Sequence, residues 1–261
     1  MRIPLYQVDA FTDRPFAGNP AAVCPLEAWL PEDVMQAIAA ENNLSETAFF
    51  VADGEGWHLR WFTPEAEIDL CGHATLATAF VIFRFMMPQL QRAVFGTEKA
   101  GALVVTRDGE RLALDFPAWP PAPCPPPPGL AQGLGREPVE VLAARDYLAV
   151  YDDADVVAGL VPDFAALARL DRHGIIVTAP GTGEVDFVSR FFAPGLGVGE
   201  DPVTGSSHCS LIPYWAARLG KTELSARQLS RRGGTLFCAL RGDRVTIAGH
   251  AALYLQGAIE I

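Results

Sequence analysis

The chain has 261 residues, half of them apolar, so it can bury one large core or two modest ones. Its formal net charge is −11, and no basic run is longer than the pair Arg231 and Arg232, which argues against a nucleic-acid partner. The five cysteines show neither CxxC nor Cys/His ligand spacing, so we expect a reducing, cytoplasmic location rather than a disulfide framework or a metal site.

The N-terminal segment and the longest apolar run do not indicate export or membrane insertion. Pro4, Gln7 and Asp9 interrupt residues 1–11, unlike the continuous apolar segment of a signal peptide. The apolar run at residues 74–83 is too short to span a bilayer and is typical of a buried helix. We therefore expect no membrane partner.

The first half of the chain predicts the order strand, strand, helix, strand, strand, helix. Alternating apolar residues indicate the strands, and apolar spacings of three and four after Pro31 indicate the first helix. The second helix starts near Gly72 and is apolar over most of its length. The predicted ranges are strands at 3–11, 21–24, 48–52 and 57–62, with helices after residue 31 and over 74–85.

The second half repeats this order after a Pro-rich stretch at residues 117–128. Its predicted ranges are strands at 139–143, 147–151, 175–179 and 187–192, with helices after residue 162 and over 209–219, the latter opening near Gly205. Proline has no amide hydrogen and cannot continue a helix. We therefore expect residues 117–128 to form neither a ladder nor a helix, but an extended, stiff connector between the halves.

Two pairs of short motifs indicate an internal duplication. Arg-Trp-Phe-Thr-Pro at residues 60–64 recurs as Arg-Phe-Phe-Ala-Pro at 190–194, and Gly-His-Ala at 72–74 aligns with Gly-Ser-Ser at 205–207. The offset grows from 130 to 133, which predicts a loop three residues longer in the second copy. The alternative is a chance resemblance between two aromatic strands that precede apolar helices; we favour duplication.

The two apolar helices predict the fold class. A helix that is apolar around most of its circumference must be enclosed, and a curved antiparallel sheet around each one satisfies this requirement. We predict an α+β protein of two pseudo-symmetric lobes, each a curved, mostly antiparallel, barrel-like sheet around a central apolar helix, with a cleft between them. One lobe is expected to contain residues 1–117 and about 248–261, and the other residues 118–247.

The starts of these helices are candidate anion sites. The first turn of a helix presents unpaired amides and the positive end of the helix dipole, and a glycine there lets a ligand approach the backbone. Gly72 and Gly205 supply these positions, so a substrate carboxylate is the expected ligand. The alternative is that both glycines only relieve crowding where a strand enters a helix.

The segment around the second helix start, residues 199–207, lacks the lysine and the spacing of a P-loop, which excludes nucleotide binding by that motif. Asp201 could orient a proton-carrying group, and Ser206 and Ser207 could bind an anion. Each could instead cap the helix, and for Ser207 capping is the stronger alternative.

His73 and Glu46 are the candidate proton carriers. His73 stands at a helix start where imidazole could bind an anion or relay a proton, whereas His208 and His250 lack comparable support. Glu46 lies between a predicted helix and an apolar strand, where partial withdrawal from water would favour its protonated form and suit it to proton transfer. From the residues alone, a solvated turn acid is the better-supported alternative for Glu46.

Several motifs along the whole chain resemble those of the phenazine-biosynthesis (PhzF-like) isomerases, which share the fold of diaminopimelate epimerase. The motifs are Asp-Ala-Phe-Thr at 9–12, Phe-Ala-Gly-Asn-Pro at 16–20, the segment 43–50, Asp-Leu-Cys-Gly-His-Ala-Thr at 69–75 and Gly-Glu-Asp-Pro-Val-Thr-Gly-Ser at 199–206. Their order is specific for the family but says little about the substrate.

This resemblance implies a homodimer that isomerises a small carboxylate-bearing substrate without a metal or organic cofactor, as the best-known member of the family does in phenazine biosynthesis. It implies that Glu46 removes a proton from one carbon and returns it to another, and that His73, Asp201 and Ser206 assist. We assign substrate binding to four further residues: Asn19, Gly72, Gly205 and Ser207.

Two other functions remain open. The related epimerases use two thiols; Cys71 matches the first, and a helix start should lower its pKa, but the second falls at Thr204. A racemase or epimerase would therefore need Cys71 and a different acid, while Cys209 is expected to pack in its helix core. The second alternative is a non-catalytic small-molecule-binding protein that retains the cleft.

Overall fold

The protein is built from two units, each with its own buried helix, and its strands belong to one 17-stranded sheet. The computed structural model describes residues Met1–Ile261. Unit 1 comprises Met1–Asp115 with Ala248–Ile261, and unit 2 comprises Phe116–Ile247. The chain passes from one unit to the other within β8 (Arg111–Pro117) and returns within β16 (Arg244–Gly249). None of the helices is both long and apolar enough to cross a membrane.

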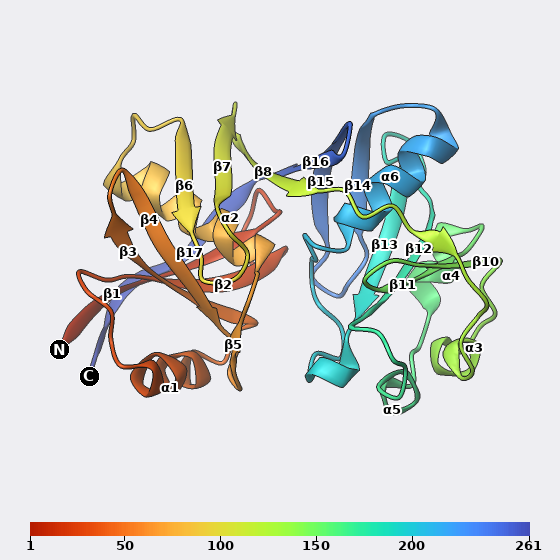
Figure 1. Ribbon diagram of the computed structural model, residues 1–261, viewed down its shortest axis with the longest axis horizontal. Coiled ribbons are helices and arrows are strands. Elements are labelled where there is room, and N and C mark those ends of the chain that lie inside the picture. Colours follow the sequence, from red (N-terminus) through yellow and green to blue (C-terminus); the bar gives the residue numbers. More distant parts are fainter. The chain divides into compact units, whose positions relative to one another are not determined.

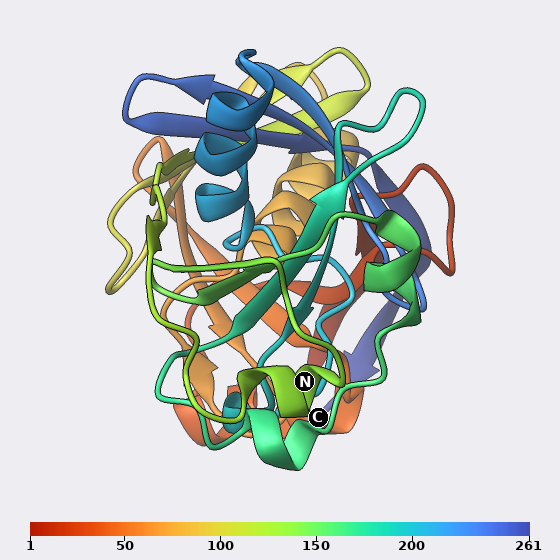
Figure 2. The same cartoon turned by 90° about the vertical axis from the view of Figure 1, so that its right-hand side faces the viewer.

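In unit 1 the strands besides parts of β8 and β16 are β1 (Arg2–Ala10), β2 (Asn19–Pro25), β3 (Glu46–Asp53), β4 (Gly56–Phe62), β5 (Glu67–Ile68), β6 (Arg92–Gly96), β7 (Leu103–Asp108) and β17 (Ala251–Glu260). The helices are α1 (Glu32–Asn42), α2 (Gly72–Val81) and the π-helical η1 (Ile82–Met86). The termini lie side by side, and Ile261 N donates to Met1 O over 2.8 Å (Figure 2).

Unit 2 contains the strands β9 (Ala122–Pro123), β10 (Glu140–Ala143), β11 (Tyr147–Val150), β12 (Ile175–Pro180), β13 (Phe187–Phe192), β14 (Glu223–Gln228) and β15 (Gly234–Arg241). Its helices are α3 (Leu130–Leu134), α4 (Ala154–Gly159), α5 (Phe164–Leu167), the 3₁₀ turn η2 (Pro194–Leu196) and α6 (His208–Leu219), all seen in Figure 1.

The pairing of strands is the same in both units. From β1 through β2, β3, β4 and β6 to β7, successive pairs are antiparallel, parallel, antiparallel, parallel and antiparallel. From β10 through β11, β12, β13 and β14 to β15 the sequence of pairings is identical. In each unit the long helix joins two parallel neighbours, β4 to β6 or β13 to β14. The predicted pseudo-symmetric α+β fold is confirmed.

Helix α2 is the centre of unit 1. Every residue of α2 except Gly72 and Phe80 is buried, and the helix contacts β1, β2, β3, β7 and β17. Helix α1 packs against β3 and β4 through Met35, Ile38 and Ala39. Successive side chains of a strand point to opposite faces of the sheet. The strands between the two helices therefore bury apolar side chains on both of their faces.

The predicted continuous helix over 74–85 is wrong at its end, because α2 gives way to a π-helix at Ile82. Met87 N donates to Ile82 O over 2.7 Å, a bond that spans five residues and widens the last turn. The Arg107 guanidinium holds this turn by donating to the carbonyl of Phe83 over 2.8 Å while it lies over the ring of that residue. A residue of β7 therefore contacts the end of this helix directly.

Helix α6 is the counterpart of α2, but its regular part begins at His208 rather than near Gly205. The three residues before His208 form a turn whose first bond runs from His208 N to Gly205 O, at 3.0 Å. Further along α6, Trp215 is buried and stacks on Phe187 of β13. The apolar helix predicted here is confirmed, with a tighter entry turn than expected.

The Pro-rich stretch forms a ladder, which the sequence argument excluded. Ala122 and Pro123 make the short strand β9, which pairs antiparallel with β10, and Cys124 N donates to Val141 O over 3.1 Å. The stretch packs within unit 2, where Cys124 lies against the apolar core. Proline is compatible with a short edge strand because its neighbours supply the amide donors.

The repeated Arg-x-Phe motif builds the same ion pair in each unit. Arg60 on β4 binds Glu67 through Nε and Nη2, both at 2.6 Å, and Arg190 on β13 binds Glu200 at 2.7 and 3.0 Å. Each guanidinium also lies over the phenylalanine two residues later in sequence. The residue numbers of the two glutamates differ by 133, which is the larger offset of the repeat. In each unit the arginine thus fixes the loop that leads to a helix start.

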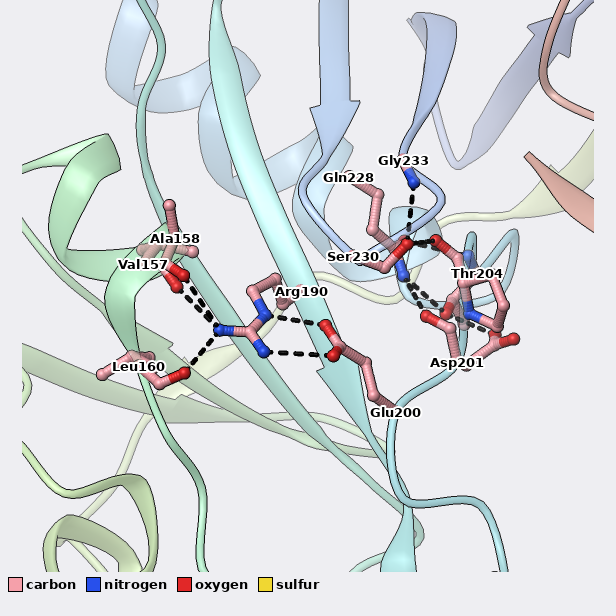
Figure 3. Close-up of polar contacts among 11 residues, drawn as sticks. Val157, Ala158, Leu160, Arg190, Glu200, Asp201, Thr204, Gln228, Ser230 and Gly233 are labelled. Carbon is pink, nitrogen blue, oxygen red and sulfur yellow. Dashed lines mark hydrogen bonds and ion pairs between the residues drawn. The ribbon is translucent and has the colours of Figure 1, made fainter. Parts of the chain in front are cut away.

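Arg190 is the more buried of the two arginines and also donates to the carbonyls of Val157, Ala158 and Leu160 at the end of α4 (Figure 3). Replacing it with alanine leaves Glu200 without its partner and three carbonyls without a donor. We expect Arg190→Ala to destabilise unit 2 by about 3 to 5 kcal/mol, measured by urea unfolding. Arg169→Ala, at an exposed position, is the control; an equal loss in both variants would contradict this account.

Candidate active site

A strained loop between β1 and β2 brings Asn19 to the start of α2. Phe16 and Gly18 have positive φ angles of 71° and 64°, and a Cβ at Gly18 would lie 2.1 Å from Ala10 O, so only glycine fits there. The buried Asp9 carboxylate holds the loop by accepting from Phe16 N at 2.9 Å. Asn19 then begins β2 with its side chain fully buried.

Glu46 is the first residue of β3 and pairs with Ala21 in the parallel ladder between β2 and β3. Its side chain is only 14% exposed. The alternative of a solvated turn acid is therefore wrong. The sequence around Glu46 could not reveal its burial, because the burial results from pairing with a strand that lies more than twenty residues earlier in the chain.

His73, the second residue of α2, connects these side chains. Its Nε2 lies 2.9 Å from Glu46 Oε2, at ion-pair distance but without the alignment of a linear hydrogen bond. Its Nδ1 lies 3.1 Å from Asn19 Nδ2, and Ser45 Oγ donates to Asn19 Oδ1 over 3.2 Å. Strand β2, the Ser45–Glu46 segment and helix α2 thus form one polar cluster in unit 1.

Cys71 joins the cluster from the residue before α2, with Sγ 3.4 Å from His73 Nδ1. Burial raises the pKa of this thiol to about 11, and the negative charge of Glu46 adds to the effect, while His73 opposes it. The expectation that the helix start lowers the pKa of Cys71 is wrong. Complete desolvation of the thiolate outweighs the favourable dipole and histidine.

The pKa of His73 is raised well above 6.5. Burial by itself lowers it, but the anionic groups beside the ring, Cys71 and Glu46, raise it by more. Because the thiol of Cys71 stays protonated near neutral pH, Glu46 is the anion that acts there. Glu46 therefore favours the protonated form of the imidazole, against the effect of burial.

The donor atoms of Glu46, Cys71 and His73 lie within 4.8 Å of one another, which could accommodate a metal ion. The positions of these donor atoms around the imidazole ring do not suit a metal site. Glu46 faces Nε2 of the imidazole, whereas Cys71 faces Nδ1, and one ion cannot bind both ring nitrogens. The arrangement fits a chain of proton donors and acceptors better than a convergent set of ligands.

The first backbone amides of α2 have no partner within the helix. The N-cap, Cys71, makes no side-chain capping bond, and its carbonyl accepts from Thr75 N and from Thr75 Oγ1 at 3.2 and 2.5 Å. The first backbone donor within the helix is Thr75 N, so the amides of Gly72 and His73 make no bond within the helix. These amides form the positive end of the helix dipole, next to the imidazole of His73.

In unit 2 the corresponding loop is held by side chains from the end of β14 and from the loop after it (Figure 3). Asp201 Oδ2 accepts from Thr204 Oγ1, and the fully buried Gln228 bonds to both residues. Ser230 Oγ donates to Pro202 O over 2.7 Å. Asp201 therefore lies in an ordered loop directly before the entry turn of α6.

The two serines of the entry turn differ. Ser206 is partly exposed, and its amide, like that of Gly205, precedes the first bonded donor at His208. Ser207 is buried, and its hydroxyl donates back to Thr204 O over 2.9 Å. Ser207 makes no capping bond, so the capping interpretation is wrong, and its buried hydroxyl stabilises the turn.

His208 and Cys209 serve the interior of unit 2. His208 Nδ1 donates to Thr204 O over 2.8 Å, and burial lowers the pKa of this imidazole to about 4. In the repeat, His208 corresponds to Thr75, whose hydroxyl bonds to Cys71 O in the same way. Cys209 is buried, with its pKa raised to about 12, as expected of a core thiol.

The sequence-predicted residues thus form two groups. Glu46, His73, Asn19 and Gly72 lie together in unit 1, and Asp201, Gly205, Ser206 and Ser207 lie together in unit 2. Sequence reasoning missed Ser45, Gln228 and Ser230. Ser45 directly precedes Glu46 and could have been included, but Gln228 and Ser230 lie outside every recognised motif.

Comparison with known proteins places the chain in a family. The model for phenazine biosynthesis-like proteins, PhzC–PhzF, matches residues 8–257. An uncharacterized isomerase of Pseudomonas aeruginosa is 55% identical over 261 residues, with complete coverage of both chains. The chain belongs to the phenazine biosynthesis-like (PhzC–PhzF) family.

Solved structures agree with this assignment. The crystal structure of a PhzF-family protein of Enterococcus faecalis has a TM-score of 0.97 and 52% identity, and the match covers all of both chains. A predicted epimerase of P. aeruginosa has a TM-score of 0.76 at 20% identity, covering 98% of this chain and 99% of its own. The second likeness shows that the fold is shared with an epimerase-like protein.

The raised pKa of His73 can be measured without a substrate. We expect its ring resonances in ¹H–¹³C NMR spectra to titrate above pH 6.5 and to shift to lower pH in Glu46→Gln, because the amide removes the anion and leaves the effect of burial. His208, with a pKa of about 4, is an internal reference that stays neutral above about pH 6. Titration of His73 below 6.5 in the unmodified protein would contradict the pairing with Glu46.

Proposed function

We propose that this protein is a cofactor-independent isomerase that moves a proton within a small carboxylate-bearing substrate, with Glu46 as the general base and acid. The observation that carries the proposal is the contact of 2.9 Å between Glu46 Oε2 and His73 Nε2, in a cluster where both side chains are largely buried. Family membership supports an isomerase, since close relatives carry that name.

Glu46 fits the role of a shuttle because a carboxylate can take a proton from carbon and, with a small movement, return it to another carbon on the same face. His73 fits the role of its partner. The imidazolium stabilises the carboxylate of Glu46 before proton abstraction, and it lies beside the first-turn amides of α2 that can bind the carboxylate of the substrate.

In unit 2 we assign Asp201 and Ser206 to binding and proton transfer, and the amides of Gly205 and Ser206 to a carboxylate. The assignment is supported by the ordered loop that holds Asp201 and by the entry turn of α6. We assign Asn19 to orienting His73 as well as to substrate binding, because its amide already contacts the ring.

The proposed reaction needs one carboxylate rather than two thiols. Thr204 takes the position of the second thiol in the repeat, and its hydroxyl donates to Asp201. Cys71 is a thiol whose pKa is about 11, so it is a poor base near neutral pH. We further propose that the enzyme acts in the cytoplasm as a homodimer, and that exhaustive dialysis against a chelator leaves its turnover unchanged.

The test is proton exchange with solvent. We expect the protein in ²H₂O to incorporate deuterium into at least one member of a panel of small unsaturated carboxylic acids, followed by ¹H NMR. Glu46→Gln should lower the rate at least about 100-fold, because an amide cannot accept the proton. Glu41→Gln, which alters an exposed carboxylate on α1, should retain the full rate. Full exchange by Glu46→Gln would rule out its role.

The epimerase alternative makes the opposite prediction for Cys71. Since its pKa is about 11 and it is buried, we expect iodoacetamide at neutral pH to leave Cys71 unmodified, as shown by peptide mass spectrometry, and Cys71→Ala to keep at least about a tenth of the exchange rate. Rapid alkylation that a carboxylate ligand prevents, together with loss of exchange in Cys71→Ala, would favour the epimerase. Ligand binding without any exchange would favour a non-catalytic binding protein.

A further inference from the structure

Gln228, the last residue of β14, lies at the point where this strand meets the loop before α6. Its side chain is fully buried and uses both ends of its amide. Oε1 accepts from Thr204 N at 2.9 Å, and Nε2 donates to Asp201 O at 2.8 Å and to Thr204 Oγ1 at 3.2 Å. One side chain therefore binds both ends of the four-residue loop from Asp201 to Thr204 (Figure 3).

Thr204 has no free polar group as a result. Its amide is held by Gln228, its hydroxyl donates to Asp201, and its carbonyl accepts from Ser207 Oγ and His208 Nδ1. Thr204, the residue directly before Gly205, is thus fixed through its amide, its hydroxyl and its carbonyl. A fixed peptide at this position determines where the next amides, those of Gly205 and Ser206, are presented.

The supporting contacts come from adjacent strands. Ser189 on β13 pairs with Gln228 on β14, and the next residue on β13, Arg190, holds Glu200 at the start of the loop. On the other side, Ser230 donates to Pro202 O and accepts from Gly233 N. Gln228 is the member of this set that contacts Asp201 and Thr204 directly.

We infer that Gln228 is a positioning residue for the anion-binding turn of unit 2: it holds Asp201 and Thr204 so that the amides of Gly205 and Ser206 are preorganised for a substrate carboxylate. The inference rests on the proposed function, because that function assigns the carboxylate to this turn. Preorganised donors bind an anion more tightly than donors that must first be ordered, since the ordering cost has been met during folding.

The probe is benzoate, a small carboxylate, titrated into the ¹⁵N-labelled full chain while the amide resonances of Gly205 and Ser206 are followed. The unmodified protein should show saturable shifts at both amides. In Gln228→Met, which removes all three bonds while keeping the length of the side chain, we expect the Kd for benzoate to rise about tenfold or more.

Gln36→Met is the matched control. Gln36 Nε2 donates to Thr63 O in unit 1, so this variant also loses an amide-to-carbonyl bond and should lower the Tm without changing the Kd at Gly205 and Ser206. Gln228→Glu keeps the acceptor for Thr204 N but loses both donor bonds and adds a negative charge beside the turn, so its Kd should rise at least as much as that of Gln228→Met. If Gln228→Met does not fold, Ser230→Ala, which loses the bonds to Pro202 O and Gly233 N but leaves Gln228 in place, should still raise the Kd about two- to threefold.

A Kd unchanged in folded Gln228→Met, or in Gln228→Glu and Ser230→Ala together, would overturn the inference and leave the proposed function intact. An unmodified protein without shifts at Gly205 and Ser206 would overturn both the anion site of unit 2 and the role of Gln228. The deuterium exchange that depends on Glu46 is measured separately, so failure of the proton shuttle and failure of this turn give different results.

Discussion

The burial of α2 is the constraint on which unit 1 depends. A helix with almost every side chain buried must be enclosed by strands, yet its first-turn amides have no partners within the helix. Unit 1 places a histidine at the second position of this helix and a carboxylate from β3 against it. The helix that stabilises the core therefore also supplies the backbone donors and the histidine of the candidate site, which lies where the core ends.

The two units share the contacts that hold the loop before the long helix, but they differ in the residues at the start of that helix. Both units hold the loop before the long helix with a bidentate arginine–glutamate pair, and both bond a side chain of the first turn back to the carbonyl four residues earlier. The residues presented at the two helix starts differ. Cys71 and His73 in one unit correspond to Thr204 and Ser206 in the other, so titratable groups gather in unit 1 while unit 2 offers hydroxyls and amides.

Electrostatics near α2 shows why position on a helix is a weak guide to pKa. A helix start favours a thiolate, and the sequence argument applied that rule to Cys71. In the folded chain the sulfur is buried and close to the negative charge of Glu46, and both effects raise its pKa. For His73 the balance is reversed, because the neighbouring anion outweighs the cost of burial. The same carboxylate thus raises the pKa of the thiol, together with burial, and the pKa of the imidazole, against burial.

The sequence by itself determined the order of the elements, the two buried helices, the internal repeat and the family, because alternating and helical periodicities and spaced motifs are local properties of a chain. It did not reveal the strands over residues 92–117 and 223–260, the π-helical end of α2 or the ladder in the Pro-rich stretch. Only the tertiary structure decided that Glu46 is buried, that Cys71 stays protonated and that Gln228 holds the loop before α6. The physical reason is that desolvation, charge and hydrogen bonding depend on neighbours brought from distant strands.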